Sequence, residues 1–188
     1  VVIPSVRRPK DLARAIGSVE RLDVPPGQAR PGIVVVAQEA DSPTHDVARA
    51  MGVRVVTVDR PGLAWAMHEG ARAADTEVVA FIDDDAEVHR DWLLRLVRHY
   101  DDPRVGGVGG RGLLVHIPTP AAHQRPVARI SPIGQVTGGH HQAAGPARFV
   151  DHLKGANCSF RRSALLRTDI QTRVFGAGAQ SRNEFALS

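Results

Sequence analysis

A run of five apolar residues that ends in three consecutive aspartates constrains this sequence more than any other feature. Residues 78–82 read VVAFI, and Asp83, Asp84 and Asp85 follow at once. A strand that is buried on both faces is apolar throughout, as in parallel sheets. Acids directly after such a strand lie at the carboxyl edge of the sheet, where open α/β sheets bind ligands. The run therefore predicts a buried strand that ends in a site able to hold a metal ion.

A helix start or a solvated turn is the alternative reading of these aspartates, because acidic residues favour the first turn of a helix. The next helical pattern, at residues 92–97, begins several positions later. Three adjacent carboxylates also repel one another at short range. We therefore favour a functional role for the cluster.

Apolar runs and helical patterns alternate along the first hundred residues. Strands are expected at residues 1–5, 33–37, 53–58 and 78–82, and helices at residues 9–19, 44–51, 63–74 and 91–100. This regular alternation predicts an α/β fold with a mostly parallel central sheet and helices on both of its faces.

The second half of the chain has a different pattern. Residues 116–148 are rich in proline and glycine, which disfavour long helices, and two short antiparallel strands are expected at residues 127–130 and 134–137. Residues 113–115 and the stretch at residues 149–162 also have strand character. Three histidines of this half, His140, His141 and His152, match no strong metal-binding spacing.

A literal G-x-G-x-x-G pattern occurs at Gly107, Gly109 and Gly112. A dinucleotide-binding pattern must connect a strand to a helix and precede an acid by about 20 residues. Here a helix precedes the glycines and a strand is expected after them. We attribute the glycines instead to tight turning and close packing of a strand.

Composition limits the classes of partner. The 188 residues, 43% hydrophobic and 23% charged, suit one globular domain. The net charge of +4 comes mainly from arginines, whose guanidinium groups suit phosphate, but the chain has no basic block typical of nucleic-acid binding. Cys158 is the only cysteine, which excludes an internal disulfide and favours a reducing, cytoplasmic setting. No apolar run is long enough to span a membrane.

Four segments together resemble the inverting nucleotide-sugar glycosyltransferases of family 2, which have the GT-A fold. They read VVIPSVRRPKDLARAIGSV, GLAWAMHEGARAADTEVVAFIDDDAEVHRDWL, KGANCSFRRSAL and GAGAQSRNEFAL, in the family's order and at its approximate spacing. The resemblance implies one GT-A-like domain over residues 1–188. Residues 1–112 would form its nucleotide-sugar-binding half, and residues 113–188 a loop-rich, partly antiparallel acceptor-side half that continues beyond the C-terminal end.

The resemblance also implies roles for single residues. Asp83 and Asp85 match the family's D-x-D, which would bind Mg²⁺ or Mn²⁺ on the donor diphosphate, and Glu184 matches its catalytic base. The residues implied around the nucleotide sugar are Pro4, Ser5, Arg7, Gln38, Glu39, Gly62, Asp83 and Asp84. Those implied on the sugar and acceptor side are Gly155, Ala156, Asn157 and Asn183.

These roles imply transfer of a sugar, with inversion, from a UDP-, dTDP- or GDP-linked donor to a hydroxyl of a carbohydrate, lipid-linked or small-molecule acceptor. A divalent cation would stabilise the leaving diphosphate. A carboxylate base would remove the proton of the acceptor hydroxyl as it attacks. We expect this reaction in the cytoplasm, with the inner face of the membrane as an alternative setting.

Three departures from the family pattern lie on the donor side. Ser5-Val6-Arg7 stands where the family commonly has Thr-Tyr-Asn, Ala37 stands where an acid is usual, and Met67-His68 replaces a frequent Arg-Asn. These departures leave the nucleotide open. Two other functions also stay open: a sugar-phosphate nucleotidylyltransferase and a non-catalytic nucleotide-sugar-binding domain. The first would want a glycine-rich loop after the first strand, and residues 5–9 contain no glycine.

Overall fold

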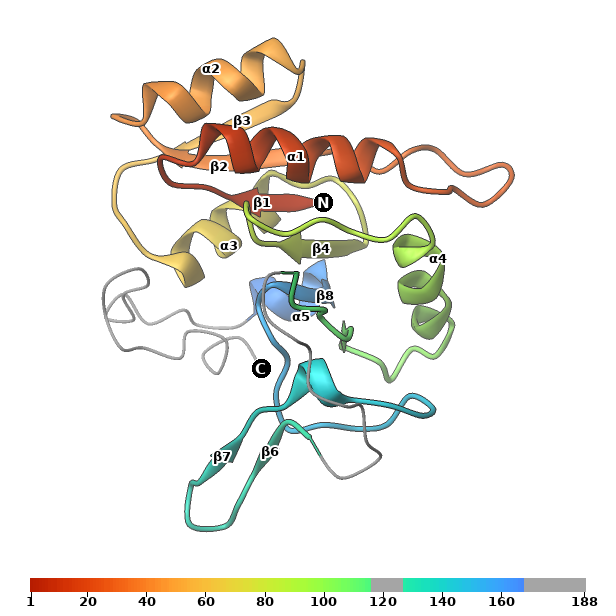
Figure 1. The fold of residues 1–188 in the computed structure, drawn as a ribbon. Coiled ribbons are helices and arrows are strands. Elements are labelled where there is room, and N and C mark those ends of the chain that lie inside the picture. The colour runs from red at the N-terminus through yellow and green to blue at the C-terminus, as the bar shows by residue number, and fades with distance from the viewer. Residues whose placement is uncertain (116–126, 168–188) are drawn as a thin grey trace.

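The structure, a computed structural model, describes residues 1–115 and 127–167 (Figure 1). The strands of its main sheet are β1 (Val2–Pro4), β2 (Val34–Gln38), β3 (Arg54–Val58), β4 (Val78–Ile82), β5 (Gly107–Gly109) and β8 (Asn157–Arg161). The helices are α1 (Pro9–Glu20), α2 (Ser42–Ala50), α3 (Leu63–Ala73), α4 (Trp92–Val97) and α5 (Arg162–Leu166). A separate pair of strands is β6 (Arg129–Ile130) and β7 (Val136–Thr137), and two short 3-10 helices are η1 (Arg98–Asp101) and η2 (His140–Gln142).

The main sheet has the strand order β3-β2-β1-β4-β8-β5. β1 pairs in parallel with β2 and β4, and β2 pairs in parallel with β3. β8 runs antiparallel to both β4 and β5. The sheet is therefore mostly parallel, as the alternation of apolar runs and helical patterns predicts.

Strand residues alternate between two apolar cores, one on each face of the sheet. Val2 and Phe81 pack with Met67 of α3 and Leu165 beyond it, whereas Ile3 and Ile82 pack against the opposite helices. The second core contains buried residues of α1, α2 and α4: Leu12, Ala15, Ile16, Val19, Ala48, Trp92 and Leu96. Helices thus cover both faces, and the α/β expectation is confirmed.

One of the later strands lies at a different place from the one that the sequence predicts. Residues 113–115 form no strand, and their side chains are exposed. The strand forms instead at Gly107–Gly109, where a Cβ on Gly107 would lie 2.8 Å from the Phe160 ring. The expected short antiparallel pair is confirmed as β6 and β7, which extend from the rest of the fold as a hairpin (Figure 1).

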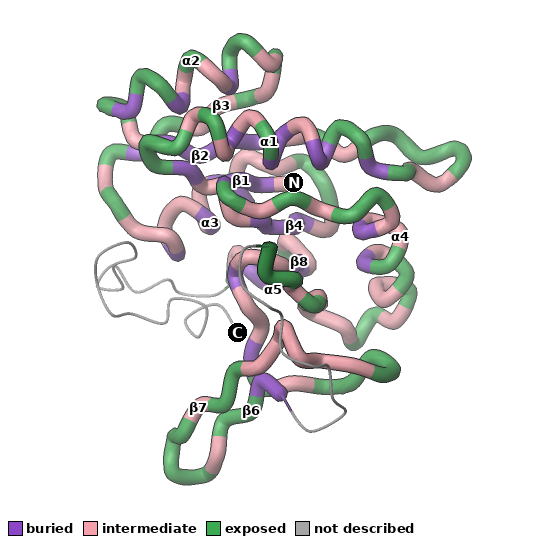
Figure 2. Tube along the Cα trace, in the orientation of Figure 1, coloured by how far each residue is buried: buried purple, intermediate pink, exposed green. Residues whose placement is uncertain are grey.

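Burial is concentrated in the central strands of the main sheet, whereas the β6–β7 hairpin is mostly exposed (Figure 2). Within the two described ranges, no helix has both the length and the apolar character needed to cross a bilayer.

Candidate functional site

The carboxyl ends of β1, β2 and β4 meet at one edge of the sheet. Ser5 follows β1, Gln38 ends β2, and Asp83 follows β4. β1 lies between the other two strands, so the loops after all three strands are neighbours. This is the edge at which open α/β sheets bind their ligands.

Asp84 ties the loop after β4 to the loop after β1. Its Oδ2 accepts hydrogen bonds from Ser5 Oγ at 2.8 Å and from the Val6 N–H at 3.3 Å. Asp84 is buried, with 7% of its surface exposed. Burial raises the pKa of Asp84, and the hydrogen bonds from Ser5 and Val6 only partly offset that effect. Asp84 therefore fixes the protein's own loop, at the position that the sequence assigned to nucleotide binding.

Asp41 holds the other side of the same loop. Its Oδ2 accepts from the Arg7 N–H and from Thr44 Oγ1, both at 2.7 Å, and its Oδ1 accepts from the Thr44 N–H, which caps α2. Burial of Asp41 favours a higher pKa, but these hydrogen bonds outweigh it and hold the pKa below its usual value. Arg7 itself adopts a left-handed backbone, with φ of 55°, and the bond from its N–H stabilises that conformation.

Asp85, in contrast, is half-exposed and forms an ion pair with Arg8. Arg8 Nη1 donates to Asp85 Oδ2 at 2.6 Å and lies 3.4 Å from Asp84 Oδ1. The charges of Asp84 and Asp85, with the hydrogen bond to Asp85, raise the pKa of the Arg8 guanidinium. Of the two arginines in the loop after β1, Arg8, rather than the sequence-assigned Arg7, therefore contacts the aspartates.

The acidic loop is also attached to α1. The Val88 N–H donates to Ser18 Oγ at 3.1 Å, and Arg14 lies 3.5 Å from Glu87. Within the loop, the Ala86 N–H donates to the Asp83 carbonyl at 3.2 Å. These contacts set the direction in which Asp83 and Asp85 leave β4.

The other residues assigned to the nucleotide sugar lie along the same edge. Pro4 ends β1, and Glu39 is exposed in the turn after Gln38. Gly62 precedes α3 with φ of 138°, a conformation that side-chain-bearing residues rarely adopt. Beyond Gly62, the Arg60 guanidinium lies 3.8 Å from the centre of the Trp65 ring.

One departure from the family pattern, Met67-His68, lies in α3, the helix before β4. Met67 faces the core with 2% of its surface exposed, and His68 stacks on Trp65 with 6.0 Å between ring centres. Neither side chain is therefore placed as a free polar group at the edge of the sheet.

Asn157 links the end of β4 to the end of β5. It pairs with Ile82, its Oδ1 accepts from Trp92 Nε1 at 2.8 Å, and its Nδ2 donates to the Arg111 carbonyl at 3.3 Å. The neighbouring Gly155 is buried. A Cβ on Gly110 would lie 2.6 Å from the Asn157 side chain, so this crossing needs a glycine. The pairing with Ile82 places Asn157 beside Asp83, on the expected sugar side of the site.

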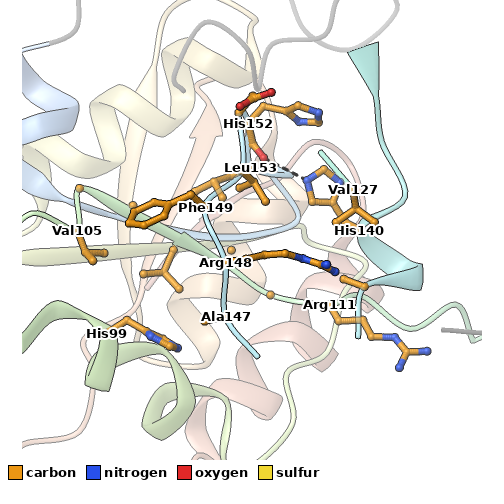
Figure 3. A pocket seen from close by; sticks show the side chains of 18 of the residues that line it. His99, Val105, Arg111, Val127, His140, Ala147, Arg148, Phe149, His152 and Leu153 are labelled. Atoms are coloured by element: carbon orange, nitrogen blue, oxygen red, sulfur yellow. Dashed lines mark hydrogen bonds between the residues drawn. The ribbon is translucent and has the colours of Figure 1, made fainter. Parts of the chain in front are cut away.

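A cavity of about 760 Å³ begins beside this crossing and follows β5 and β8 (Figure 3). Gly110 and Arg111 line it near the carboxyl end of β5. Figure 3 shows Arg111, Arg148 and His140 toward one end of the cavity and His99 and Val105 toward the other. The cavity therefore runs from the carboxyl end of β5 into the half of the chain expected to bind the acceptor.

Asp83 and Asp85 supply the donor atoms that a hard divalent cation prefers, namely carboxylate oxygens. Across residues 1–115 and 127–167, no group of three or more His, Cys, Asp or Glu side chains is placed to hold a metal ion. Mg²⁺ is usually bound through one or two carboxylates together with water and substrate phosphates, so a third protein ligand is not required. The two aspartates fit a cation that is bound together with a diphosphate.

The histidines of the cavity have other contacts. His140 and His152 lie edge to face, with 5.0 Å between ring centres, and each has a ring nitrogen near a backbone carbonyl. Two of the assigned site residues, Asn183 and Glu184, lie outside the described ranges together with the closing segment of the resemblance.

The resemblance assigned no role to two residues of this edge, Asp41 and Arg8. The family usually has an acid at the position of Ala37, and the acid that holds the loop after β1 stands four residues later, at Asp41. A signal was present, because Asp41 precedes Ser42 and Pro43, a sequence typical of a helix start. Arg8 carried no such signal, since its contact with Asp85 depends on how two distant loops meet.

Comparison with known proteins gives one family. The sequence model of Glycosyl transferase family 2 matches residues 1–165. Uncharacterized glycosyltransferases of Mycobacterium bovis and Mycobacterium tuberculosis are 32% identical over 101 residues, which is 54% of this chain and 43% of each relative.

Solved structures share the fold at low sequence identity. A mannosyltransferase of Pyrobaculum calidifontis, in complex with GDP-Man and Mn²⁺, superposes with a TM-score of 0.61 at 20% identity, over 88% of this chain and 45% of that one. Glucosyl-3-phosphoglycerate synthase of Mycobacterium tuberculosis, in complex with UDP, gives 0.57 at 21% identity, over 87% and 56%. TarS of S. aureus gives 0.67 at 16% identity, over 99% and 52%. The chain thus spans about half the length of the proteins that it matches.

Proposed function

The chain belongs to glycosyl transferase family 2, and from this premise we propose that it transfers a sugar from a nucleoside-diphosphate donor to an acceptor hydroxyl, with inversion. One observation carries the proposal. The loops after β1, β2 and β4 meet at one edge of the sheet, held together by Asp41 and Asp84, and leave Asp85 exposed there. Fixed loops and an exposed carboxylate are what a diphosphate with its metal ion needs in order to bind.

The donor is a UDP-, dTDP- or GDP-linked sugar. Two proteins of the same fold support this class, since one was solved with GDP-Man and Mn²⁺ and another with UDP. In this chain Ser5, Gln38, Glu39 and Gly62 lie along the edge where the nucleotide would sit. The half-exposed Trp65, next to Arg60, adds an aromatic surface near Gly62.

The carboxylates of the acidic loop have separate roles. Asp83 and Asp85 would hold Mg²⁺ or Mn²⁺, and the bound ion would stabilise the negative charge of the leaving diphosphate. Asp84 holds the loop after β1 in place through Ser5 and the Val6 N–H. A fixed loop costs no rearrangement when the donor binds, which favours catalysis by preorganisation.

The acceptor is expected to approach from the side of β8 and β5. Asn157 of β8 pairs with the last residue of β4, and the cavity lies along β5, which pairs with the other side of β8. We assign the base to Glu184, which would remove the proton of the acceptor hydroxyl as this oxygen attacks the sugar. The resemblance of the segment GAGAQSRNEFAL to the family supports this role, and a positioned base typically contributes about 10²–10⁴-fold.

Hydrolysis of a panel of UDP-, dTDP- and GDP-linked sugars, with Mn²⁺ or with EDTA, tests the proposal. We expect one donor class to be hydrolysed with Mn²⁺ and not with EDTA. Asp85→Asn should slow this reaction by about 100-fold or more, since loss of a group that stabilises transition-state charge typically has such an effect.

The matched control is Asp46→Asn, which removes an equally charged, exposed carboxylate from α2. This variant should keep the wild-type rate. Binding of a donor without hydrolysis would indicate a non-catalytic binding domain instead. An unchanged rate in Asp85→Asn would contradict the proposed role of the acidic loop.

A further inference from the structure

Arg8 contacts both carboxylates that leave the end of β4, yet its side chain remains about half exposed. Nη1 lies 2.6 Å from Asp85 Oδ2 and 3.4 Å from Asp84 Oδ1, and 53% of the side-chain surface is accessible. The pair with Asp85 joins positions 77 residues apart in the sequence. It brings the loop after β1 to the acid that the D-x-D resemblance assigns to the metal.

The two aspartates differ in what else they contact. Asp84 also accepts from Ser5 and Val6 and is buried, so it keeps its place without Arg8. Asp85 has 52% of its side chain exposed, and Arg8 is its one ion-pair partner among the residues that the structure describes. Arg8 and a divalent cation would therefore compete for the same carboxylate.

The backbone of Arg8 is fixed while its guanidinium can move. The Arg8 carbonyl accepts from the Leu12 N–H at 2.9 Å, and the preceding Arg7 N–H is bound to Asp41. An ion pair between two exposed groups contributes little to stability, so Arg8 can leave Asp85 at low cost. Its planar guanidinium suits the oxygens of a phosphate, with which it forms paired hydrogen bonds.

The start of α1 adds partial positive charge beside Arg8, and the one acid of its first turn, Asp11, is paired with Arg14. Arg8 is the N-cap residue of the twelve-residue helix α1, whose first turn carries a partial positive charge. A diphosphate at the carboxyl edge of the sheet would meet this helix end and the guanidinium together.

We propose that Arg8 releases Asp85 when the donor binds and pairs with the donor diphosphate instead. In the free protein it neutralises Asp85. When a nucleoside diphosphate binds with its metal ion, the guanidinium moves to the phosphate oxygens and Asp85 becomes available to the metal. The inference rests on the proposed function, because it places the diphosphate at this edge. Its consequence is that metal and nucleotide strengthen each other's binding.

Two affinities measured on Arg8→Gln test this exchange, and neither depends on turnover. Binding of Mn²⁺ alone is followed by the loss of the free-ion signal in electron paramagnetic resonance. It should tighten by about 2- to 5-fold, the range that corresponds to loss of one exposed ion pair. Binding of UDP and GDP in saturating Mn²⁺, followed by calorimetry, should weaken by about 10- to 100-fold, the loss expected for a charged hydrogen bond.

Arg14→Gln is the matched control, because it removes the same charge from the same helix. Arg14 pairs with Asp11 and Glu87 and has 59% of its side chain exposed. Both affinities should stay within about 1.5-fold of wild type, since surface charges that do not contact a site act only weakly on it. Equal tightening of Mn²⁺ binding in Arg14→Gln would show a general charge effect and overturn the exchange.

Other outcomes are equally decisive. Unchanged Mn²⁺ affinity in Arg8→Gln would show that Arg8 does not compete for Asp85, and unchanged nucleotide affinity would show that it does not move to the phosphate. Either result overturns the inference while the wild-type protein still binds nucleotide with Mn²⁺. A wild-type protein that binds neither UDP, dTDP nor GDP would instead overturn the proposed function.

Discussion

The half of the molecule built on β1 to β4 and the half around the β6–β7 hairpin hold their loops in different ways. In the first, buried carboxylates tie neighbouring loops together: Asp41 binds the Arg7 N–H, and Asp84 binds Ser5. In the second, Ile133 and Phe149 each have 89% of their surface exposed. The first half thus buries small acidic side chains, whereas the second exposes large apolar ones. Figure 2 shows the exposed hairpin.

This difference shows which loops the fold holds in fixed positions. The edge formed by the loops after β1, β2 and β4 is fixed by hydrogen bonds to buried, charged groups, which are among the stronger contacts in proteins. The hairpin half is joined to the rest through β5 and β8 and encloses the cavity beside them. We therefore expect substitutions in the first half to act on stability and nucleotide binding, and similar substitutions in the hairpin to do neither.

The largest expected difference in the free energy of unfolding comes from replacing an isoleucine with alanine at a core position and at a hairpin position. Ile16 in α1 has no exposed surface, so Ile16→Ala should lower the free energy of unfolding by about 2–5 kcal/mol. Ile133→Ala should change it by less than about 0.5 kcal/mol. Urea denaturation of both variants measures the difference. Equal losses would break the comparison, because they would show that Ile133 packs in a core.

The parallel half could be predicted from sequence because its strands are buried on both faces. Residues 34–37 are all buried, and an apolar run of that kind has no stable position at a surface. Residues 113–115 are apolar as well, yet they are exposed and form no strand. Apolarity alone therefore misplaced β5, whose position depends on pairing with β8.

Alanine substitutions at two separate glycines, Gly70 and Gly112, give the next largest difference in the free energy of unfolding. A Cβ on Gly70 would lie 2.3 Å from Val2 Cγ1, so Gly70→Ala should lower the free energy of unfolding by about 1–3 kcal/mol despite the better helix propensity of alanine. A Cβ on Gly112 would meet no atom within 4 Å, and Gly112→Ala should stay within about 0.5 kcal/mol of wild type. Thermal and urea denaturation provide the comparison. A neutral Gly70→Ala would show that α3 can move away from β1.

The smallest effect, which also depends on pH, concerns the buried acid that holds the loop after β1. Asp41→Asn places an amide N–H₂ where one carboxylate oxygen accepts, and should lower the free energy of unfolding by about 1–2 kcal/mol near neutral pH. Asp151→Asn is the matched change beside the hairpin. The Asp151 side chain is 32% exposed and pairs with Arg129, so we expect a loss below about 0.5 kcal/mol.

The sign of the pH dependence follows from the lowered pKa of Asp41. Its stabilising contribution is complete above the unfolded pKa of about 3.9 and is lost as the pH falls through the lower pKa of the folded state. The difference between wild type and Asp41→Asn should therefore be constant from neutral pH to about pH 5 and shrink below about pH 4. Urea midpoints across this range measure it. A difference that grows on acidification would contradict the role given to the Asp41 carboxylate.

The position of a side chain could be predicted where it follows from one strand, and not where it depends on contacts between loops. Asp83 and Asp85 lie directly after β4, as the sequence predicts. The different contacts of Asp84 and Asp85 could not be predicted, because they depend on Ser5 and Arg8, nearly eighty residues earlier. Likewise, the acid that the family usually has at the position of Ala37 is absent, and Asp41 serves the loop after β1 from the start of α2.

Binding of UDP and GDP with and without Mn²⁺, by wild type and by Asp85→Asn, tests the central claim most directly. The claim is that the acidic loop after β4 holds a metal ion together with a nucleoside diphosphate. In wild type, Mn²⁺ should raise the affinity for one of these nucleotides by about 5-fold or more, a typical coupling between two ligands, and in Asp85→Asn this increase should be lost. Equal strengthening by Mn²⁺ in both proteins, or none in either, would contradict the claim.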